Sequence, residues 1–441
     1  MGSSYKPFRL WEDEKDAVYI VRLAPLKTGV EMQLLSDSKQ FEVCIYQDDT
    51  LVKSVTATEK FVTVDGLAED AEYSLIVKSE NGESRKRLFR TGDYLGTVVN
   101  YLHPKDEYYA FSGRYIASPH IIRFKGDLYV SMDVFRGGDQ RGAFNLTLLY
   151  RSKDNGKNWE YVTDIVPSFW GTLFVANGKL GIAAADTEAG SLVVMSSEDG
   201  ENWSDPTYLL YGCGSTVGCG FHSTPTPYIE KDGKLYFGFE YGGHGVKRFD
   251  TFIACFDMSK DICDKSAWTI SGKRRVEFEW DPNSDCSIRF AIESNIVERD
   301  GEIFSISRFA YRRALMLKYD DKNPEKAPEF YKVVDFLPGH CKFYIQKADN
   351  GIYYALGNNG CYPRHKIECC ASKDLENWVH LKTFEDISDR SVEQDGVQYP
   401  SFIIENGKFV TVLRNALNGA HTFHDSNAIV FKTYDIPEWK E

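Results

Sequence analysis

A strand, a glycine-containing turn and a second strand recur six times between residues 94 and 441 of this chain. The turn glycines are Gly126, Gly178, Gly233, Gly301, Gly351 and Gly407. They lie roughly 50 to 70 residues apart, a spacing typical of one blade. The repeat therefore predicts an all-β, six-bladed β-propeller over residues 94–441.

A second strand pair follows these hairpins, and in three repeats it carries a turn rich in Ser, Asp and Trp. The turns are Ser152–Trp159, Ser196–Trp203 and Ser372–Trp378. In such a turn Ser and Asp bond the backbone, Gly takes the positive φ and Trp packs the turn onto the blade. They resemble the Asp-boxes, or BNR repeats, of the sialidase-like superfamily, and the resemblance covers residues 95–441. The last repeat lacks a fourth strand, which we expect residues 96–101 to supply, closing the ring.

The N-terminal part has a different pattern. Residues 14–93 alternate apolar and polar in short runs separated by turns, which predicts a β-sandwich. The stretch Val64–Val77 resembles the late strands of fibronectin type III modules, in which a Leu and a Tyr anchor the core. Residues 1–13 are interpreted as a tag or leader.

Composition narrows the function classes. A net charge of −13 argues against nucleic-acid binding, which needs basic stripes. The sequence contains no run of eighteen apolar residues, so no membrane span is predicted. The ten cysteines show no CxxC spacing, so we expect no zinc site, no cofactor and mostly buried free thiols in a reducing cytoplasm. Secretion stays open if a signal peptide was removed. Abundant aromatic residues, 14% of the chain, suit both sheet packing and sugar binding.

Polar and titratable residues are predicted to converge on one mouth of the propeller. The glycine turns and the Asp-box-like turns share one face, so the opposite face collects the segments leading into each inner strand and the loops leaving its partner. The leading segments hold Arg114, His120, Trp170, His222, Glu293, His340 and Tyr399. The exit loops hold Asp133, Asp139, Glu240, Arg308, Asn358, Arg364, Arg414, His424 and Asp425, among others. Such convergence indicates a site.

The resemblance to sialidases implies catalytic roles for some of these residues. Sialidases use a tyrosine nucleophile assisted by a glutamate and protonate the leaving group with an aspartate. The matching positions imply Tyr399 as nucleophile, Glu293 as its base, and Asp139 as acid with Asp133 as the alternative. A phenol needs a nearby carboxylate base, and a neutral nucleophile avoids repulsion from an anionic sugar.

The same resemblance implies arginines that bind a substrate carboxylate through their planar fork. Arg308 and Arg364 match two of the three positions in sialidases. Arg114, in Gly113–Pro119, is displaced from the third. Glu240, His340, Arg414 and His424 are further candidates for binding substrate, and Trp170 is either a sugar platform or blade packing.

Several histidine segments depart from the sialidase pattern and resemble a bacterial subgroup of sialidase-like proteins. They are Phe221–Pro225, with His222 as a further catalytic candidate, Gly339–Phe343 and Ala420–Asn427. His424 and Asp425 suggest an oriented base. Adjacent strand residues face opposite ways, however, so we expect these two not to touch.

Three functions remain open on the sequence. The first is an exo-acting, sialidase-like glycosidase that releases a terminal acidic sugar from an oligosaccharide or glycoconjugate. The second is a polysaccharide lyase on uronate-containing glycans, in which a Tyr or His removes a proton beside a carboxylate. The third is a glycan-binding propeller without activity. The sugar, the linkage and the oligomeric state are not determined by the sequence.

Overall fold

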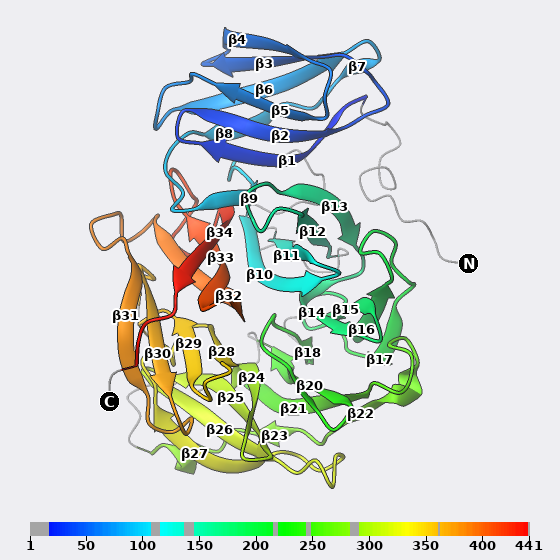
Figure 1. Ribbon diagram of the computed structural model, residues 1–441, viewed down its shortest axis with the longest axis vertical. Coiled ribbons are helices and arrows are strands. Elements are labelled where there is room, and N and C mark those ends of the chain that lie inside the picture. The colour runs from blue at the N-terminus through cyan, green and yellow to red at the C-terminus, as the bar shows by residue number, and fades with distance from the viewer. Residues whose placement is uncertain are drawn as a thin grey trace.

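The computed structural model describes residues 17–106, 115–135, 145–214, 219–243, 248–282, 291–359 and 362–439. Within these ranges the chain is all β, apart from short 3₁₀ turns at Lys265–Ala267 and Phe278–Trp280. A β-sandwich lies above a ring of six blades (Figure 1). The predicted fold class is therefore confirmed.

Two sheets form the sandwich. The first has the order β1-β2-β5, and the second has the order β4-β3-β6, with β7 and β8 both paired to β6. Their bounds are β1 (Tyr19–Leu26), β2 (Gly29–Leu35), β3 (Phe41–Gln47), β4 (Thr50–Ala57), β5 (Phe61–Asp65), β6 (Glu72–Ser79), β7 (Gly82–Glu83) and β8 (Arg87–Arg90). Leu67 and Tyr73 are both buried in the core, and the Tyr73 hydroxyl accepts a 3.0 Å hydrogen bond from Ala68 N. The predicted alternation is visible in β5, where Val62 and Val64 are buried between exposed neighbours.

The first three blades each pair neighbouring strands antiparallel, and the third carries two extra short strands, β19 and β23. Blade 1 consists of β10 (Tyr115–Phe124), β11 (Asp127–Phe135), β12 (Thr147–Ser152) and β13 (Glu160–Ile165). Blade 2 consists of β14 (Phe169–Ala176), β15 (Lys179–Ala185), β16 (Leu192–Ser197) and β17 (Thr207–Leu210). Blade 3 consists of β18 (Gly220–His222), β19 (Ile229–Lys231), β20 (Lys234–Gly243), β21 (Arg248–Asp257), β22 (Trp268–Ile270) and β23 (Arg274–Arg275).

The last three blades complete the ring with four strands each. Blade 4 consists of β24 (Ile292–Arg299), β25 (Glu302–Ala310), β26 (Arg313–Tyr319) and β27 (Glu329–Asp335). Blade 5 consists of β28 (Phe343–Lys347), β29 (Tyr353–Gly357), β30 (Lys366–Ser372) and β31 (Val379–Asp386). Blade 6 consists of β32 (Gly396–Glu405), β33 (Lys408–Ala416), β34 (Ala428–Asp435) and β9 (Thr97–Tyr101).

The ring closes as predicted. Strand β9, which precedes blade 1 in the chain, pairs antiparallel with β34 as the outermost strand of blade 6. The first and last parts of the propeller are thereby joined by backbone hydrogen bonds, which leaves blade 6 with no missing strand.

The three Ser- and Asp-containing turns have one shared geometry. The Asp154 carboxylate accepts bonds from the Ser152 hydroxyl and from Asn158 N, at 2.8 and 2.9 Å. Asp199 and Asp374 are bonded in the same way by Ser197 and Ser372. In the second turn the contacting serine is thus Ser197 rather than the preceding Ser196.

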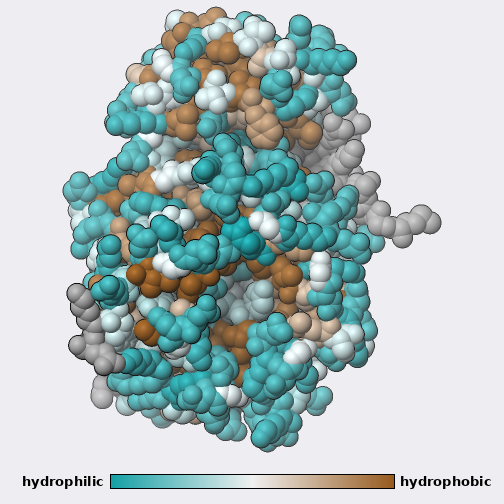
Figure 2. All heavy atoms as spheres, in the orientation of Figure 1, coloured by the Kyte–Doolittle hydropathy of each residue, from teal (hydrophilic) through white to brown (hydrophobic). Residues whose placement is uncertain are grey.

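Hydrophilic residues cover most of the visible surface, and hydrophobic residues gather around a hollow at the centre of the propeller (Figure 2). Five of the eight cysteines in the described ranges are buried: Cys44, Cys255, Cys341, Cys369 and Cys370. In the part of the chain that the structure describes, no helix has the length and apolar character needed to cross a membrane.

Candidate functional site

The inner strands of four blades carry a β-bulge at the same place. In each, two residues of the inner strand lie opposite one residue of its partner, and the first of the two has a positive φ. These first residues are Ser118, Trp170, Glu293 and Tyr399, with φ of 54°, 54°, 60° and 54°. Each lies eight positions before the turn glycine of its hairpin. A bulge re-aims a side chain, so the repeat itself brings these positions to the propeller axis.

The second strand of each hairpin also carries a residue at an equivalent position in all six blades. Seven residues after each turn glycine stand Asp133, Ala185, Glu240, Arg308, Asn358 and Arg414. All six lie at the end of the second strand or directly after it, and all but Arg308 are buried. The propeller symmetry thus gathers two rings of side chains at one mouth.

Tyr399 and Glu293 come together from blades 6 and 4. The Tyr399 hydroxyl donates a 3.1 Å hydrogen bond to Glu293 Oε1. Burial and the Glu293 charge raise the pKa of Tyr399, so the phenol is neutral at pH 7. Burial disfavours the Glu293 carboxylate, but Arg308, Lys342 and Arg364 together bring its pKa below the usual value. The pair therefore joins a neutral phenol to an ionised carboxylate.

Three arginines surround this pair. Arg308 Nη1 lies 3.3 Å from Glu293 Oε2. The guanidinium carbons of Arg414 and Arg364 lie 4.8 and 5.3 Å from the centre of the Tyr399 ring. All three arginines act electrostatically on the pKa of Tyr399.

Two of these guanidinium groups are buried beside neutral partners. Arg364 donates to Gln398 Oε1 and to the Tyr362 hydroxyl, and its buried Nε has no hydrogen-bond partner among the described residues. Arg414 donates to Ser426 Oγ at 2.9 Å and to the carbonyl oxygen of His424. Among the described residues no carboxylate forms an ion pair with either arginine. Buried charges are ordinarily paired, so this geometry suits an anionic ligand.

Lys342 also lies at this site, although no motif in the sequence indicated it. Its side chain is fully buried, Nζ donates a 3.0 Å bond to Pro400 O, and Nζ lies 5.9 Å from the Tyr399 ring centre. Burial lowers the pKa of Lys342 to about 7, against the attraction of Glu293. The repeat did contain a signal for this residue. Lys342 immediately precedes β28, close to the position that Glu293 and Tyr399 occupy in their own repeats. The turn of blade 5 is longer, so the spacing to the turn glycine differs.

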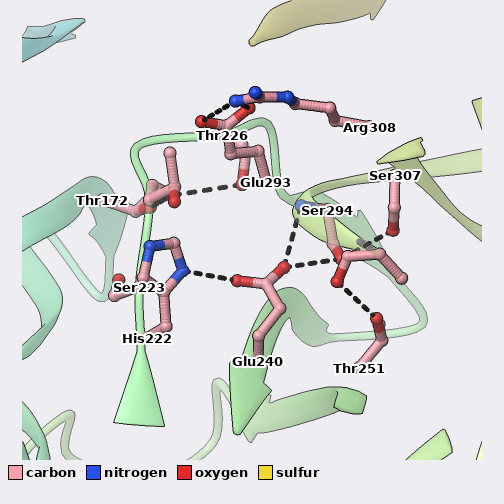
Figure 3. A network of polar contacts seen from close by, with 12 residues as sticks. Thr172, His222, Ser223, Thr226, Glu240, Thr251, Glu293, Ser294, Ser307 and Arg308 are labelled. Atoms are coloured by element: carbon pink, nitrogen blue, oxygen red, sulfur yellow. Dashed lines mark hydrogen bonds and ion pairs between the residues drawn. The ribbon is translucent and has the colours of Figure 1, made fainter. Parts of the chain in front are cut away.

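His222 and Glu240 form a buried network beside Glu293 (Figure 3). His222 Nδ1 lies 2.9 Å from Glu240 Oε2. Glu240 Oε1 accepts bonds from Ser294 N and Ser294 Oγ, at 3.1 and 2.8 Å. Because Ser294 follows Glu293 in the bulge of β24, this network anchors the segment that carries the candidate base.

His424 and Asp425 touch, which corrects the expectation that they would not. His424 Nδ1 lies 2.8 Å from Asp425 Oδ1, and His421 Nδ1 lies 2.9 Å from Asp425 Oδ2. The expectation assumed a strand, but these residues lie in bends after β33, where alternation does not apply.

His120 is a core residue, not a mouth residue. Its Nε2 lies 3.0 Å from the Tyr344 hydroxyl, and its Nδ1 accepts a 3.1 Å bond from Leu173 N. The bulge at Ser118 shifts the register of β10, so that Ser118 instead of His120 occupies the axial position.

Asp133 is buried, and its assigned partners are neutral groups. Thr147 Oγ1 donates a 2.7 Å hydrogen bond to its carboxyl group, and the backbone N–H of Trp170 donates another. Burial raises the pKa of Asp133 to about 8, against those two bonds. Trp170 is itself packed among rings: it stacks on Phe169 at 5.5 Å and meets His222 edge-on at 4.8 Å.

Two predicted residues, Arg114 and Asp139, lie outside the described residues. The ring centre of His340 lies 6.0 Å from that of Tyr362, whose hydroxyl accepts a bond from Arg364. Burial, Arg308 and Arg364 lower its pKa, so the imidazole is neutral at pH 7.

Comparison with known proteins identifies the fold. No family model and no curated protein matches the sequence. A Trypanosoma rangeli sialidase in complex with 2,3-difluorosialic acid is similar, with a TM-score of 0.51 and 13% identity over 80% of this chain. The same sialidase with the inhibitor DANA has a TM-score of 0.51 and 14% identity over 80% of this chain. Both matches cover 56% of the sialidase chain, so this protein spans just over half of that length. At these identities the likeness establishes a shared propeller fold.

Proposed function

We propose that the protein is an exo-acting glycoside hydrolase that releases a terminal acidic sugar by a sialidase-like, retaining mechanism. The observation that carries this proposal is the hydrogen bond from Tyr399 to Glu293 within a group of three arginines. In a chain of net charge −13, such a concentration of buried positive charge favours an anionic ligand. The names of the similar sialidases support the same substrate class.

In the proposed reaction Arg308, Arg364 and Arg414 bind the sugar carboxylate. The Tyr399 oxygen attacks the anomeric carbon while its proton passes to Glu293 Oε1. The bond to the leaving oxygen breaks, and that oxygen takes a proton from an acid. Water then attacks the anomeric carbon and gives a proton to the deprotonated acid, while the bond to Tyr399 breaks and the Tyr399 oxygen recovers its proton from Glu293.

For the acid we retain the two aspartates, Asp139 and Asp133. A pKa of about 8 keeps Asp133 protonated at neutral pH, which suits a donor. Because Asp133 is buried, we favour Asp139 as the acid. Asp139→Asn and Asp133→Asn, assayed with a poor and a good leaving group, separate them: loss confined to the poor leaving group identifies the acid.

The first experiment is product analysis on sialylated, uronate-capped and neutral oligosaccharides. We expect the wild type to release a terminal acidic sugar and Tyr399→Phe to lose at least about a hundredfold in rate, in the range of lost nucleophilic or acid–base assistance. Tyr46→Phe, in the sandwich strand β3, is the matched control and keeps full activity.

Other outcomes would replace the proposal. An unsaturated uronate product would identify a polysaccharide lyase. Binding of an acidic glycan without any product would identify a glycan-binding propeller. Equal rates for Tyr399→Phe and wild type would remove Tyr399 from the chemistry.

A further inference from the structure

The loop that leaves β33 in blade 6 places an imidazole beside the arginines. Arg414, whose guanidinium carbon lies 4.8 Å from the centre of the Tyr399 ring, donates through Nη2 to the carbonyl oxygen of His424. The His424 ring also meets the Tyr115 ring edge-on, with 6.0 Å between centres. Its side chain is nevertheless 41% exposed. The imidazole is thus held by its neighbours but accessible to a ligand.

The contacts of His424 determine which nitrogen carries its proton. Nδ1 lies 2.8 Å from Asp425 Oδ1 and 3.5 Å from Arg414 Nη2. An ionised carboxylate only accepts, and 2.8 Å is a strong contact whereas 3.5 Å is at the limit of a hydrogen bond. Nδ1 therefore bears the hydrogen, and Nε2 retains its lone pair.

The electrostatic surroundings keep the ring neutral. The part of the ring that is buried, with Arg414 next in size, lowers the pKa of His424 to about 4, even though Asp425 opposes the shift. Arg364 also acts on His424 in the same direction as Arg414. Bonds from His424 and His421 hold the pKa of Asp425 below its usual value, so it remains an acceptor.

We propose that His424 is a specificity-determining residue: its Nε2 accepts a hydrogen bond from a hydroxyl group of the acidic sugar whose carboxylate the arginines bind. The ligand class in this inference rests on the proposed function. Guanidinium groups only donate, so they suit the carboxylate and leave the sugar hydroxyl groups in need of an acceptor. A neutral imidazole accepts such a bond without repelling the carboxylate, which an Asp or Glu in its place would do.

His365 shows how a structural histidine differs from His424. His365 Nε2 lies 3.2 and 3.0 Å from two backbone carbonyl oxygens and its side chain is buried, as expected of a structural residue. His424 instead has an anchored Nδ1 and an accessible ring.

Binding to a protein that cannot turn over its ligand tests the inference directly. In the Tyr399→Phe background, calorimetry with N-acetylneuraminic, D-glucuronic and D-galacturonic acids identifies the acid that binds, and the monodeoxy derivatives of that acid are then compared. His424→Phe keeps an aromatic ring and removes the acceptor. We expect His424→Phe to weaken binding of the parent acid by about tenfold, the factor that corresponds to one good hydrogen bond. For the one monodeoxy derivative that lacks the bonded hydroxyl, we expect the same substitution to weaken binding by less than about twofold.

The matched control is His380→Phe, because His380 on β31 is a similarly exposed histidine in contact with a carboxylate, Glu368, at 2.8 Å. It should leave every affinity unchanged. Imidazole ¹⁵N NMR of the protein supplies an independent readout, and should show His424 protonated at Nδ1 and bare at Nε2. Asp425→Asn should mix the two tautomers and weaken binding of the parent acid only in part.

The inference is overturned if the Tyr399→Phe protein binds the acid equally well with and without His424→Phe. It is also overturned if His424→Phe weakens binding of every monodeoxy derivative equally, or if NMR finds the proton on Nε2. If none of the three acids binds, the assigned ligand class is wrong. Binding with the expected deoxy pattern but no product from the wild type would leave this inference standing and remove the hydrolase proposal. If the wild type forms product but His424→Phe leaves binding unchanged, the hydrolase proposal stands and this inference is wrong.

Discussion

Lys342 is a buried amine next to the candidate catalytic pair. Its side chain is inaccessible to solvent, and Nζ donates a hydrogen bond to the carbonyl oxygen of Pro400, which follows Tyr399. It lowers the pKa of Glu293 through its charge. At this scale a single side chain therefore contributes both to the conformation of the bulge at Tyr399 and to the ionisation of the base.

We predict that Lys342→Met moves the acid limb of the pH–rate profile to higher pH. Glu293 must be ionised to accept a proton, so activity rises as pH rises through its pKa. Removing the positive charge raises that pKa, and the rise in activity then occurs at higher pH. The profile of kcat/KM on the substrate found by product analysis measures the shift. Lys347→Met, an exposed lysine of β28, is the control and should leave the profile in place; an unshifted limb in Lys342→Met contradicts the prediction.

At the scale of elements, the β-bulge is the device that builds the site. It places Glu293 and Tyr399 at the mouth, and it does so with a positive φ at residues other than glycine. L-residues pay about 1 to 2 kcal/mol for that conformation. In blade 1 the same position holds Ser118, whose buried hydroxyl has no hydrogen-bond partner in the part of the chain that the structure describes. Blade 1 thus has the strain of the bulge without a candidate catalytic side chain.

Ser118→Gly should accordingly stabilise the protein, by about 1 kcal/mol, because glycine adopts the positive φ without strain and removes an unpaired hydroxyl. Ser131→Gly, at a regular position of β11 opposite His120, should destabilise it by about 1 kcal/mol. Urea unfolding of both variants measures the difference in sign. If both variants lose stability equally, the bulge at Ser118 is not strained.

At the scale of the whole molecule, the sandwich is joined to the propeller at the strand that closes the ring. Arg22 of β1 donates to the carbonyl oxygens of Val98 and Val99 in β9, both at 2.9 Å. Arg87 of β8 forms a fully buried ion pair with Asp106, 2.5 Å between Nε and Oδ2. One hydrophobic cluster includes residues of both units. The sandwich therefore stabilises the closed ring.

We expect the two units to unfold in one calorimetric transition, and Arg87→Met to lower the free energy of unfolding by about 3 to 5 kcal/mol, the cost of leaving a buried charge unpaired. Lys86→Met is the control. Its ion pair with Asp49 is exposed and contributes at most about 1 kcal/mol. Two separate transitions in the wild type would contradict a joint unit.

Part of the site could be predicted from the sequence because the repeat is regular. Residues at a constant distance from the turn glycines, such as Glu293, Arg308, Tyr399 and Arg414, stand at equivalent places in their blades and so converge. The prediction failed for two histidine segments. His120 moved into the core because a bulge changed the register of β10, and His424 touches Asp425 because bends replace a strand.

The six-fold repeat, the closing strand and the sandwich were determined by the sequence alone, because apolar alternation and turn residues act locally along the chain. The pairing of Tyr399 with Glu293, the two arginines beside neutral partners and the buried amine of Lys342 were decided only by the tertiary structure. These contacts join different blades, between residues far apart in sequence. Burial then sets their charge states, and burial depends on how all six blades pack around the axis.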